Sequence, residues 1–132
     1  MSIDVSWQKD CQFTVTTEKG FTLAVDADAE TAPCPTELLL SALGSCSATD
    51  VVMGLQEQGV EVQALTNTVT YTLTEQEPCL YKTANLHFTV TANNVSEAQL
   101  KTAAENAITK YCHVCLMLKP AIDVSYSIEI KR

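Results

Sequence analysis

The chain has 132 residues, and its 8 basic and 16 acidic side chains give a formal net charge of −8. A domain typically spans ~100–200 residues, so this length predicts a single domain over residues 1–132. The acidic excess argues against binding to nucleic acid, whose phosphates are neutralised by Lys and Arg, and against an anionic membrane surface.

Three short alternating runs open the chain, at residues 3–7, 11–15 and 21–25. One apolar face with a period of two residues predicts half-buried strands. Glu18-Lys19-Gly20 fits a hairpin turn between the second and third runs.

Residues 36–58 are predicted to form one long helix. Pro35 stands where a first helical residue would be, and Gly59 stops the helix. Its leucines and valines surround the helix axis, as is typical of a helix buried on most sides. One small sheet cannot cover so much apolar surface, so we expect a second copy of the chain to cover the rest.

Two longer alternating stretches, 62–74 and 80–91, predict an antiparallel hairpin. Ser96 and Gln99 then have the spacing of a capping box, ahead of a helix whose apolar stripe runs from Leu100 to Cys115. Pro120 ends this helix or a short successor, and residues 122–130 form a final strand. The order β-β-β-α-β-β-α-β predicts an α+β fold.

The chain contains six cysteines, and its first residues do not have the pattern of a signal peptide. The longest uncharged stretch, 38–49, is shorter than the ~20 apolar residues that span a bilayer. We therefore expect a cytoplasmic protein without a membrane anchor, whose cysteines are free thiols and not a disulfide framework.

Cys46 lies in the middle of the long helix, with Asp50 one turn later on the same face. A lone helical cysteine is most often a small core residue. Its neighbours, however, are small, and a carboxylate is rarely placed on a buried helix without a partner. The helix dipole fades within the first turn, so activation of Cys46 requires a nearby positive charge or hydrogen bonds.

Cys112-His113-Val114-Cys115 forms a Cys-x-x-Cys motif, for which the sequence leaves three interpretations open. The sulfurs can pack on the buried face of the helix, act as redox thiols, or bind zinc. Zinc requires two further ligands, for which Cys79, Cys34 and His113 are the candidates. No second paired motif supplies them, so we expect no metal and no cofactor.

Residues 33–52, which read Pro-Cys-Pro-Thr-Glu-Leu-Leu-Leu-Ser-Ala-Leu-Gly-Ser-Cys-Ser-Ala-Thr-Asp-Val-Val, resemble the central cysteine motif of the OsmC/Ohr family. Residues 110–118 resemble that family's second cysteine motif. The order of elements and the separation of the two motifs are also similar, so the resemblance covers essentially the whole chain. It implies an α+β homodimer in which two intertwined chains enclose their central helices between curved sheets.

The resemblance also implies a thiol peroxidase that acts on organic hydroperoxides and is regenerated by a dithiol reductant. Cys46 is then the peroxidatic residue and Cys112 the resolving one. Cys115 stands where the family usually has Ser and is an alternative resolving thiol. The family's peroxidases carry an N-terminal Arg that stabilises the thiolate, whereas the only Arg here is Arg132.

The chain therefore resembles the OsmC-like branch with a Cys-x-x-x-Asp motif, in which the acid is Asp50 here. Glu37, with Lys9 or Lys19, is then the candidate for electrostatic help. The alternative function is a non-catalytic protein that binds a small molecule or lipid, or senses redox state, with the same pocket.

Overall fold

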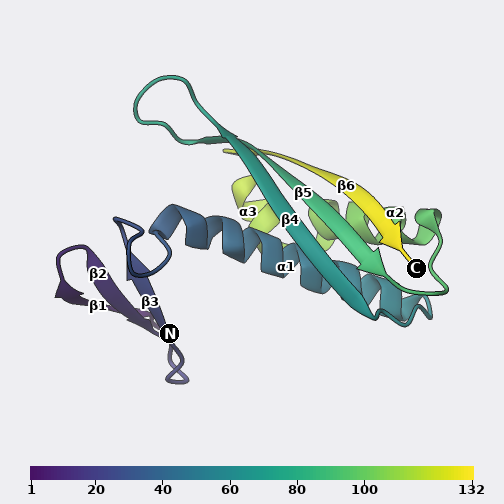
Figure 1. Ribbon diagram of the computed structural model, residues 1–132, viewed down its shortest axis with the longest axis horizontal. Coiled ribbons are helices and arrows are strands. Elements are labelled where there is room, and N and C mark those ends of the chain that lie inside the picture. Colours follow the sequence, from purple (N-terminus) through teal and green to yellow (C-terminus); the bar gives the residue numbers. More distant parts are fainter. The chain divides into compact units, whose positions relative to one another are not determined.

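The computed structural model describes residues 1–132 and consists of two compact units, residues 1–41 and 42–132. Figure 1 shows the elements along the chain, which follow the predicted α+β order.

The N-terminal unit contains a three-stranded antiparallel sheet, β1 (Asp4–Lys9), β2 (Gln12–Thr16) and β3 (Thr22–Asp26). The three predicted strands and the turn before β3 are confirmed, and Gly20 in that turn has a φ of 88°, which suits glycine. Register places the apolar residues on one face, because Val5 pairs with Val15 and Trp7 with Phe13. On that face, Val5 is 61% and Trp7 65% exposed.

The second unit contains the sheet β4 (Ala64–Leu73), β5 (Tyr81–Thr91) and β6 (Asp123–Lys131). β4 and β5 form the predicted antiparallel hairpin, whereas β6 lies parallel to β5 on its other side. A parallel pair needs a crossover connection, which the C-terminal helices supply. One face of β5 is fully buried and forms the centre of the core, with Ala84, Leu86, Phe88 and Val90.

Helix α1 (Pro35–Glu57) crosses this sheet, and two glycines allow it to approach closely. A Cβ on Gly44 would lie 3.1 Å from Cγ2 of Val69 on β4, and a Cβ on Gly54 would lie 3.3 Å from Cβ of Ala103 on α2 (Glu97–Asn106). The sequence predicted that Gly59 stops α1, and its φ of 80° is the left-handed conformation of a helix C-terminus. Helix α1 is also the one helix long and apolar enough to cross a membrane, a test that core helices of soluble proteins pass as well.

The C-terminal helical region differs from the prediction in one respect. The capping box of Ser96 and Gln99 is present, but the helix does not run unbroken to Cys115. Helix α2 continues into a π-helix, η1 (Ala107–Tyr111), the chain becomes extended at Cys112, and α3 (His113–Leu118) follows. The wider turn of η1 places the Cys112 amide over the Ala107 carbonyl, to which it donates a hydrogen bond of 2.8 Å.

Candidate functional site

The α1 side of the site begins with polar contacts that fix the helix against β4. Asn67 Nδ2 donates hydrogen bonds to the Gly44 carbonyl at 2.9 Å and to Ser47 Oγ at 3.1 Å. Ser47 Oγ in turn donates to the Leu43 carbonyl at 2.7 Å. These contacts hold the turn of α1 that carries Cys46, and the i, i+4 spacing places Asp50 on the same face.

The other side of the site is the helical break at Cys112. Backbone angles of φ −71° and ψ 108° turn the chain out of η1, and Cys112 becomes the residue that caps α3. Its Sγ accepts a hydrogen bond of 3.3 Å from the backbone N–H of Cys115. Both sulfurs of the Cys-x-x-Cys motif are fully buried.

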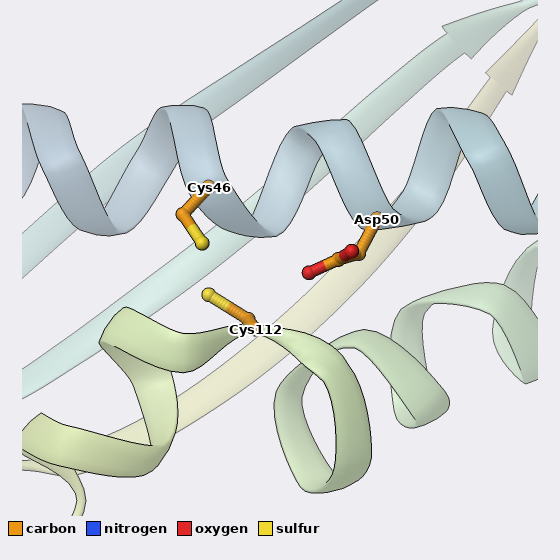
Figure 2. A group of neighbouring side chains, drawn as sticks. All are labelled: Cys46, Asp50 and Cys112. Atoms are coloured by element: carbon orange, nitrogen blue, oxygen red, sulfur yellow. The ribbon is translucent and has the colours of Figure 1, made fainter.

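The structure brings Cys46, Asp50 and Cys112 together. Both sulfur atoms and a carboxylate oxygen lie within 4.8 Å of one another. Figure 2 shows the Cys46 and Cys112 side chains pointing toward each other from facing elements, with the Asp50 carboxylate beside them. Cys46 and Asp50 are half-buried, so the cluster remains accessible from α1.

Burial keeps the two thiols of the Cys-x-x-Cys motif protonated. Desolvation raises the pKa of Cys112, and a hydrogen bond with the Cys46 side chain raises it further, against the lowering effect of the Cys115 N–H. Desolvation also raises the pKa of Cys115, while the Cys112 side chain and the charge of Lys119 lower it. Both residues are thus thiols, not thiolates, near neutral pH.

Glu37 lies in the first turn of α1, where its carboxylate accepts a hydrogen bond of 3.1 Å from the Cys34 N–H. That contact lowers the pKa of Glu37. This contact makes Glu37 a cap of α1. Glu37 is nine positions before Cys46, about 13 Å along an α-helix. Its catalytic role stays a prediction.

The two candidate lysines lie in the N-terminal unit and are exposed, Lys9 at the end of β1 and Lys19 in the turn before β3. Their role in the site also stays a prediction. The single arginine has another partner, because Arg132 donates a hydrogen bond of 2.9 Å to the Val95 carbonyl ahead of α2.

Two residues that the sequence reasoning missed contribute to the site. Asn67 binds the Gly44 carbonyl and so fixes α1 two residues before Cys46. In the sequence, it could have been found as a polar residue two positions before the inward-facing Val69 on the same strand. Lys119 carries the positive charge that lowers the pKa of Cys115. In the sequence, it could have been found from its position four residues after Cys115, one helical turn later.

A groove of about 500 Å³ reaches the cluster at Asp50, between the second half of α1 and the α2–η1 region. Its lining mixes apolar with polar surface, and the polar residues include Glu57, Thr102, Asn106 and His113. Water and small polar molecules therefore have access to the carboxylate.

Comparison with known proteins gives consistent matches over this chain. The family described as OsmC-like protein matches residues 27–127. Protein YhfA of Escherichia coli K12 is 34% identical over 131 residues, which cover 98% of each chain.

Solved structures share the fold. A hypothetical protein from Aquifex aeolicus VF5 superimposes with a TM-score of 0.84 at 25% identity, over 99% of this chain and 97% of that one. An OsmC-like protein from Mycoplasma pneumoniae gives 0.85 at 16% identity, over 99% and 96%. The organic hydroperoxide resistance protein OhrB of Bacillus subtilis gives 0.63 at 16% identity, over 99% and 98%.

Proposed function

The chain belongs to the OsmC-like protein family, and we propose that it is a thiol-dependent peroxide reductase that acts on organic hydroperoxides in the cytoplasm. Family membership supports a redox or peroxide-related role in general. The observation that carries the specific proposal is the facing pair of thiols, Cys46 and Cys112, within 4.8 Å of each other.

The first step is attack by Cys46 on the O–O bond. The Cys46 sulfur bonds to the distal oxygen of the hydroperoxide, the O–O bond breaks, and an alkoxide leaves with the bonding electron pair. Asp50, whose carboxylate oxygen lies within 4.8 Å of the Cys46 sulfur, would take the Cys46 proton after a small side-chain movement and return it to the alkoxide, which leaves as an alcohol. Sulfur is oxidised to a sulfenic acid and the peroxide oxygen is reduced.

The second step is condensation with Cys112. Its sulfur attacks the Cys46 sulfenic acid, the S–O bond breaks, and the thiol proton of Cys112 leaves with the hydroxide as water. The sulfurs must move from within 4.8 Å to a bond length of about 2.05 Å, which a modest shift of two side chains on facing elements can supply. An external dithiol then reduces the disulfide by thiol–disulfide exchange and becomes a disulfide itself.

The substrate class is supported by exposed apolar side chains next to the Cys-x-x-Cys motif in the sequence. Tyr111, Leu116 and Met117 flank the motif, and they are 57%, 42% and 69% exposed. Such side chains would bind the hydrocarbon part of an organic hydroperoxide better than they would bind hydrogen peroxide.

Self-association as a homodimer is part of the proposal. The apolar face of the β1–β2–β3 sheet is uncovered in the single chain, and so is part of α1, where Leu39 and Met53 are exposed. Exposed apolar side chains of this kind mark an interface. A second copy is the occupant that the family fold suggests.

The test is consumption of cumene hydroperoxide by reduced, untagged protein with a dithiol as reductant and a metal chelator present. We expect turnover by the wild type and by Cys79→Ser, whose exposed thiol lies outside the cluster. Cys46→Ser should abolish consumption. Cys112→Ser should still form a sulfenic acid on Cys46 that dimedone traps, but no intramolecular disulfide. Equal consumption by wild type and Cys46→Ser, or none by the wild type, contradicts the proposal.

A second candidate function, binding of a small ligand without turnover, is favoured by the groove at Asp50. The lining offers both apolar contacts, such as Met53 and Ala103, and polar groups, such as Asn106 and His113, to a small molecule or lipid. Mass spectrometry of the untagged protein under native conditions tests this candidate, which requires a bound small molecule together with a Cys46 that does not react with peroxide.

A further inference from the structure

The cluster at the thiol site contains three potential metal ligands on two separate elements. Cys46 and Asp50 lie one turn apart on α1, and Cys112 faces them from the break between η1 and α3 (Figure 2). Each residue offers one ligand atom, and the three atoms lie within 4.8 Å of one another.

These separations are close to those of a tetrahedral zinc site. With Zn–S of about 2.3 Å and Zn–O of about 2.1 Å, neighbouring ligand atoms in a tetrahedron lie roughly 3.6–3.8 Å apart. Each ligand atom therefore needs to move by no more than about 1 Å for all three to lie at bonding distance from one zinc position. Cys46 and Asp50 are only half-buried, which leaves their side chains room for this movement.

The surroundings of Asp50 also favour a cation. Its carboxylate takes part in no salt bridge and accepts no hydrogen bond from the chain, although it is half-buried. A bound divalent cation would supply the missing positive charge and pair with all three groups.

We propose that Cys46, Asp50 and Cys112 bind one divalent, thiophilic metal ion of the zinc class. Two sulfur ligands exclude Mg²⁺ and Ca²⁺, which take oxygen ligands, and the carboxylate is a ligand that zinc accepts. Three protein ligands leave a fourth position open, and the groove at Asp50 gives water access to it.

Binding of the metal replaces two thiol protons, so Zn²⁺ and two thiols give a dithiolate complex and two H⁺, with no change of oxidation state. The same two sulfurs form the disulfide in the proposed peroxidase cycle, on which this part of the inference rests. Metal and disulfide thus exclude each other. Reaction of the zinc-bound dithiolate with one hydroperoxide and two protons yields the disulfide, an alcohol, water and free Zn²⁺.

The test of the metal site is titration of reduced, chelator-treated, untagged full-length protein with Zn²⁺ and with Co²⁺ under anaerobic conditions. We expect one ion per chain, and Co²⁺ should give the thiolate charge-transfer and visible bands of a tetrahedral site. Loss of an outer-shell partner typically weakens metal binding 10–100-fold, so loss of a ligand should weaken it at least about 100-fold. Cys46→Ser, Cys112→Ser and Asp50→Asn should each do so.

The matched controls are Cys79→Ser, a thiol outside the cluster, and Glu57→Gln, an acid on the same groove. Both should bind Zn²⁺ like the wild type. In the wild type, Zn²⁺ should also slow alkylation of the half-buried Cys46 but not of the exposed Cys79. This comparison does not depend on whether a variant folds. Unchanged alkylation, or binding that survives Asp50→Asn and Cys46→Ser, overturns the proposal.

The metal site and the peroxidase can fail separately. Zinc binding is measured in the absence of peroxide, and peroxide turnover is measured with a chelator. For the exclusion of metal by disulfide, zinc-loaded protein is treated with cumene hydroperoxide in the presence of a chromogenic zinc indicator. Release of one zinc per disulfide supports the exclusion, and a disulfide that forms with the zinc retained overturns it.

Discussion

At the scale of single residues, Asn67 combines a stabilising and a destabilising contact at the edge of the site. Its Nδ2 donates two hydrogen bonds to α1, but its buried Oδ1 has no partner. An unsatisfied buried acceptor costs roughly 1–3 kcal/mol, about as much as two ordinary hydrogen bonds contribute. The net contribution of the amide to stability is therefore small, and its main effect is to fix the position of α1.

Replacement of Asn67 separates these two effects. Asn67→Leu removes the donor and the orphaned acceptor together in a similar volume, so the free energy of unfolding should stay within about 1 kcal/mol of the wild type. Asn67→Asp faces the Gly44 carbonyl with a second acceptor and should lower that free energy by roughly 1–3 kcal/mol. Urea denaturation measures both. If Asn67→Leu destabilises as much as Asn67→Asp, the account of the orphaned oxygen is wrong.

The sequence identified the reactive residues of the site better than the residues that position them. Cys46 and Asp50 are linked by helical spacing alone, and the Cys-x-x-Cys motif marks Cys112 without any structure. Lys119 and Asn67 act through other residues, and such roles depend on tertiary contacts that no local pattern encodes.

At the scale of elements, the break at Cys112 is the feature that the sequence did not predict. The apolar stripe from Leu100 to Cys115 has the period of one helix, and its buried members do lie against the core. A π-turn changes the hydrogen-bond step from four residues to five, which periodicity over so few residues cannot reveal. That change is what frees Cys112 from the helix and turns it toward Cys46.

Contact between α1 and α2 depends on Gly54. Gly54→Ala would bring a methyl group within 3.3 Å of Ala103 Cβ, and about 1 kcal/mol of gained helix propensity should offset that tight contact. Gly54→Leu overfills the same space and should lower the free energy of unfolding by about 1–3 kcal/mol. Urea denaturation of both variants measures the difference. Equal stability of Gly54→Leu and the wild type would show that α1 and α2 do not pack as described.

The loop after β3 has its own pH dependence, centred on Asp26, which is 2% exposed. The carboxylate accepts hydrogen bonds from the backbone N–H groups of Asp28, Thr31 and Glu30 and from the Thr31 hydroxyl. The Asp28 N–H has the largest effect, and together these contacts lower the pKa of Asp26 below its ordinary value of 3.8.

A carboxyl group whose pKa is lower in the folded state stabilises that state above the unfolded pKa and ceases to do so as the pH falls through the folded pKa. The loop should therefore stay ordered at pH 3.8 and open at lower pH. An NMR titration should place the Asp26 midpoint below 3.8, with faster hydrogen exchange of the Thr31 amide on the acid side. Asp26→Asn should remove this pH dependence, and a midpoint at or above 3.8 contradicts the account.

At the scale of the whole molecule, local patterns predicted the order of elements but not how distant ones pair. The β4–β5 hairpin followed from adjacent alternating runs. The parallel pairing of β6 with β5 joins segments separated by three helical segments, so no local signal fixes it. The single domain expected over residues 1–132 remains a proposal, and the proposed dimer is how the apolar face of the first unit would become buried.

The sole tryptophan, Trp7, makes the proposed dimer testable without a label. Its indole N–H is already bonded to the Asp10 carbonyl at 2.8 Å, but the side chain lies on the apolar face and is exposed in the single chain. If a second copy covers that face, Trp7 emission should be blue-shifted in concentrated protein and shift to the red on dilution, as the dimer dissociates.

Trp7→Glu should place a charge in the interface and give monomers in sedimentation velocity. Ser6→Glu is the matched control, because Ser6 pairs with Thr14 on the opposite face of the same strand and its substitution should leave the dimer intact. A Trp7→Glu protein that stays dimeric, or an emission maximum of an exposed indole at all concentrations, would show that this face is not the interface. Cys46 lies on the same helix as the exposed Leu39 and Met53, so a partner chain that covers this helix would lie near the site. Peroxide turnover by a monomeric Trp7→Glu protein would show that one chain suffices for the chemistry.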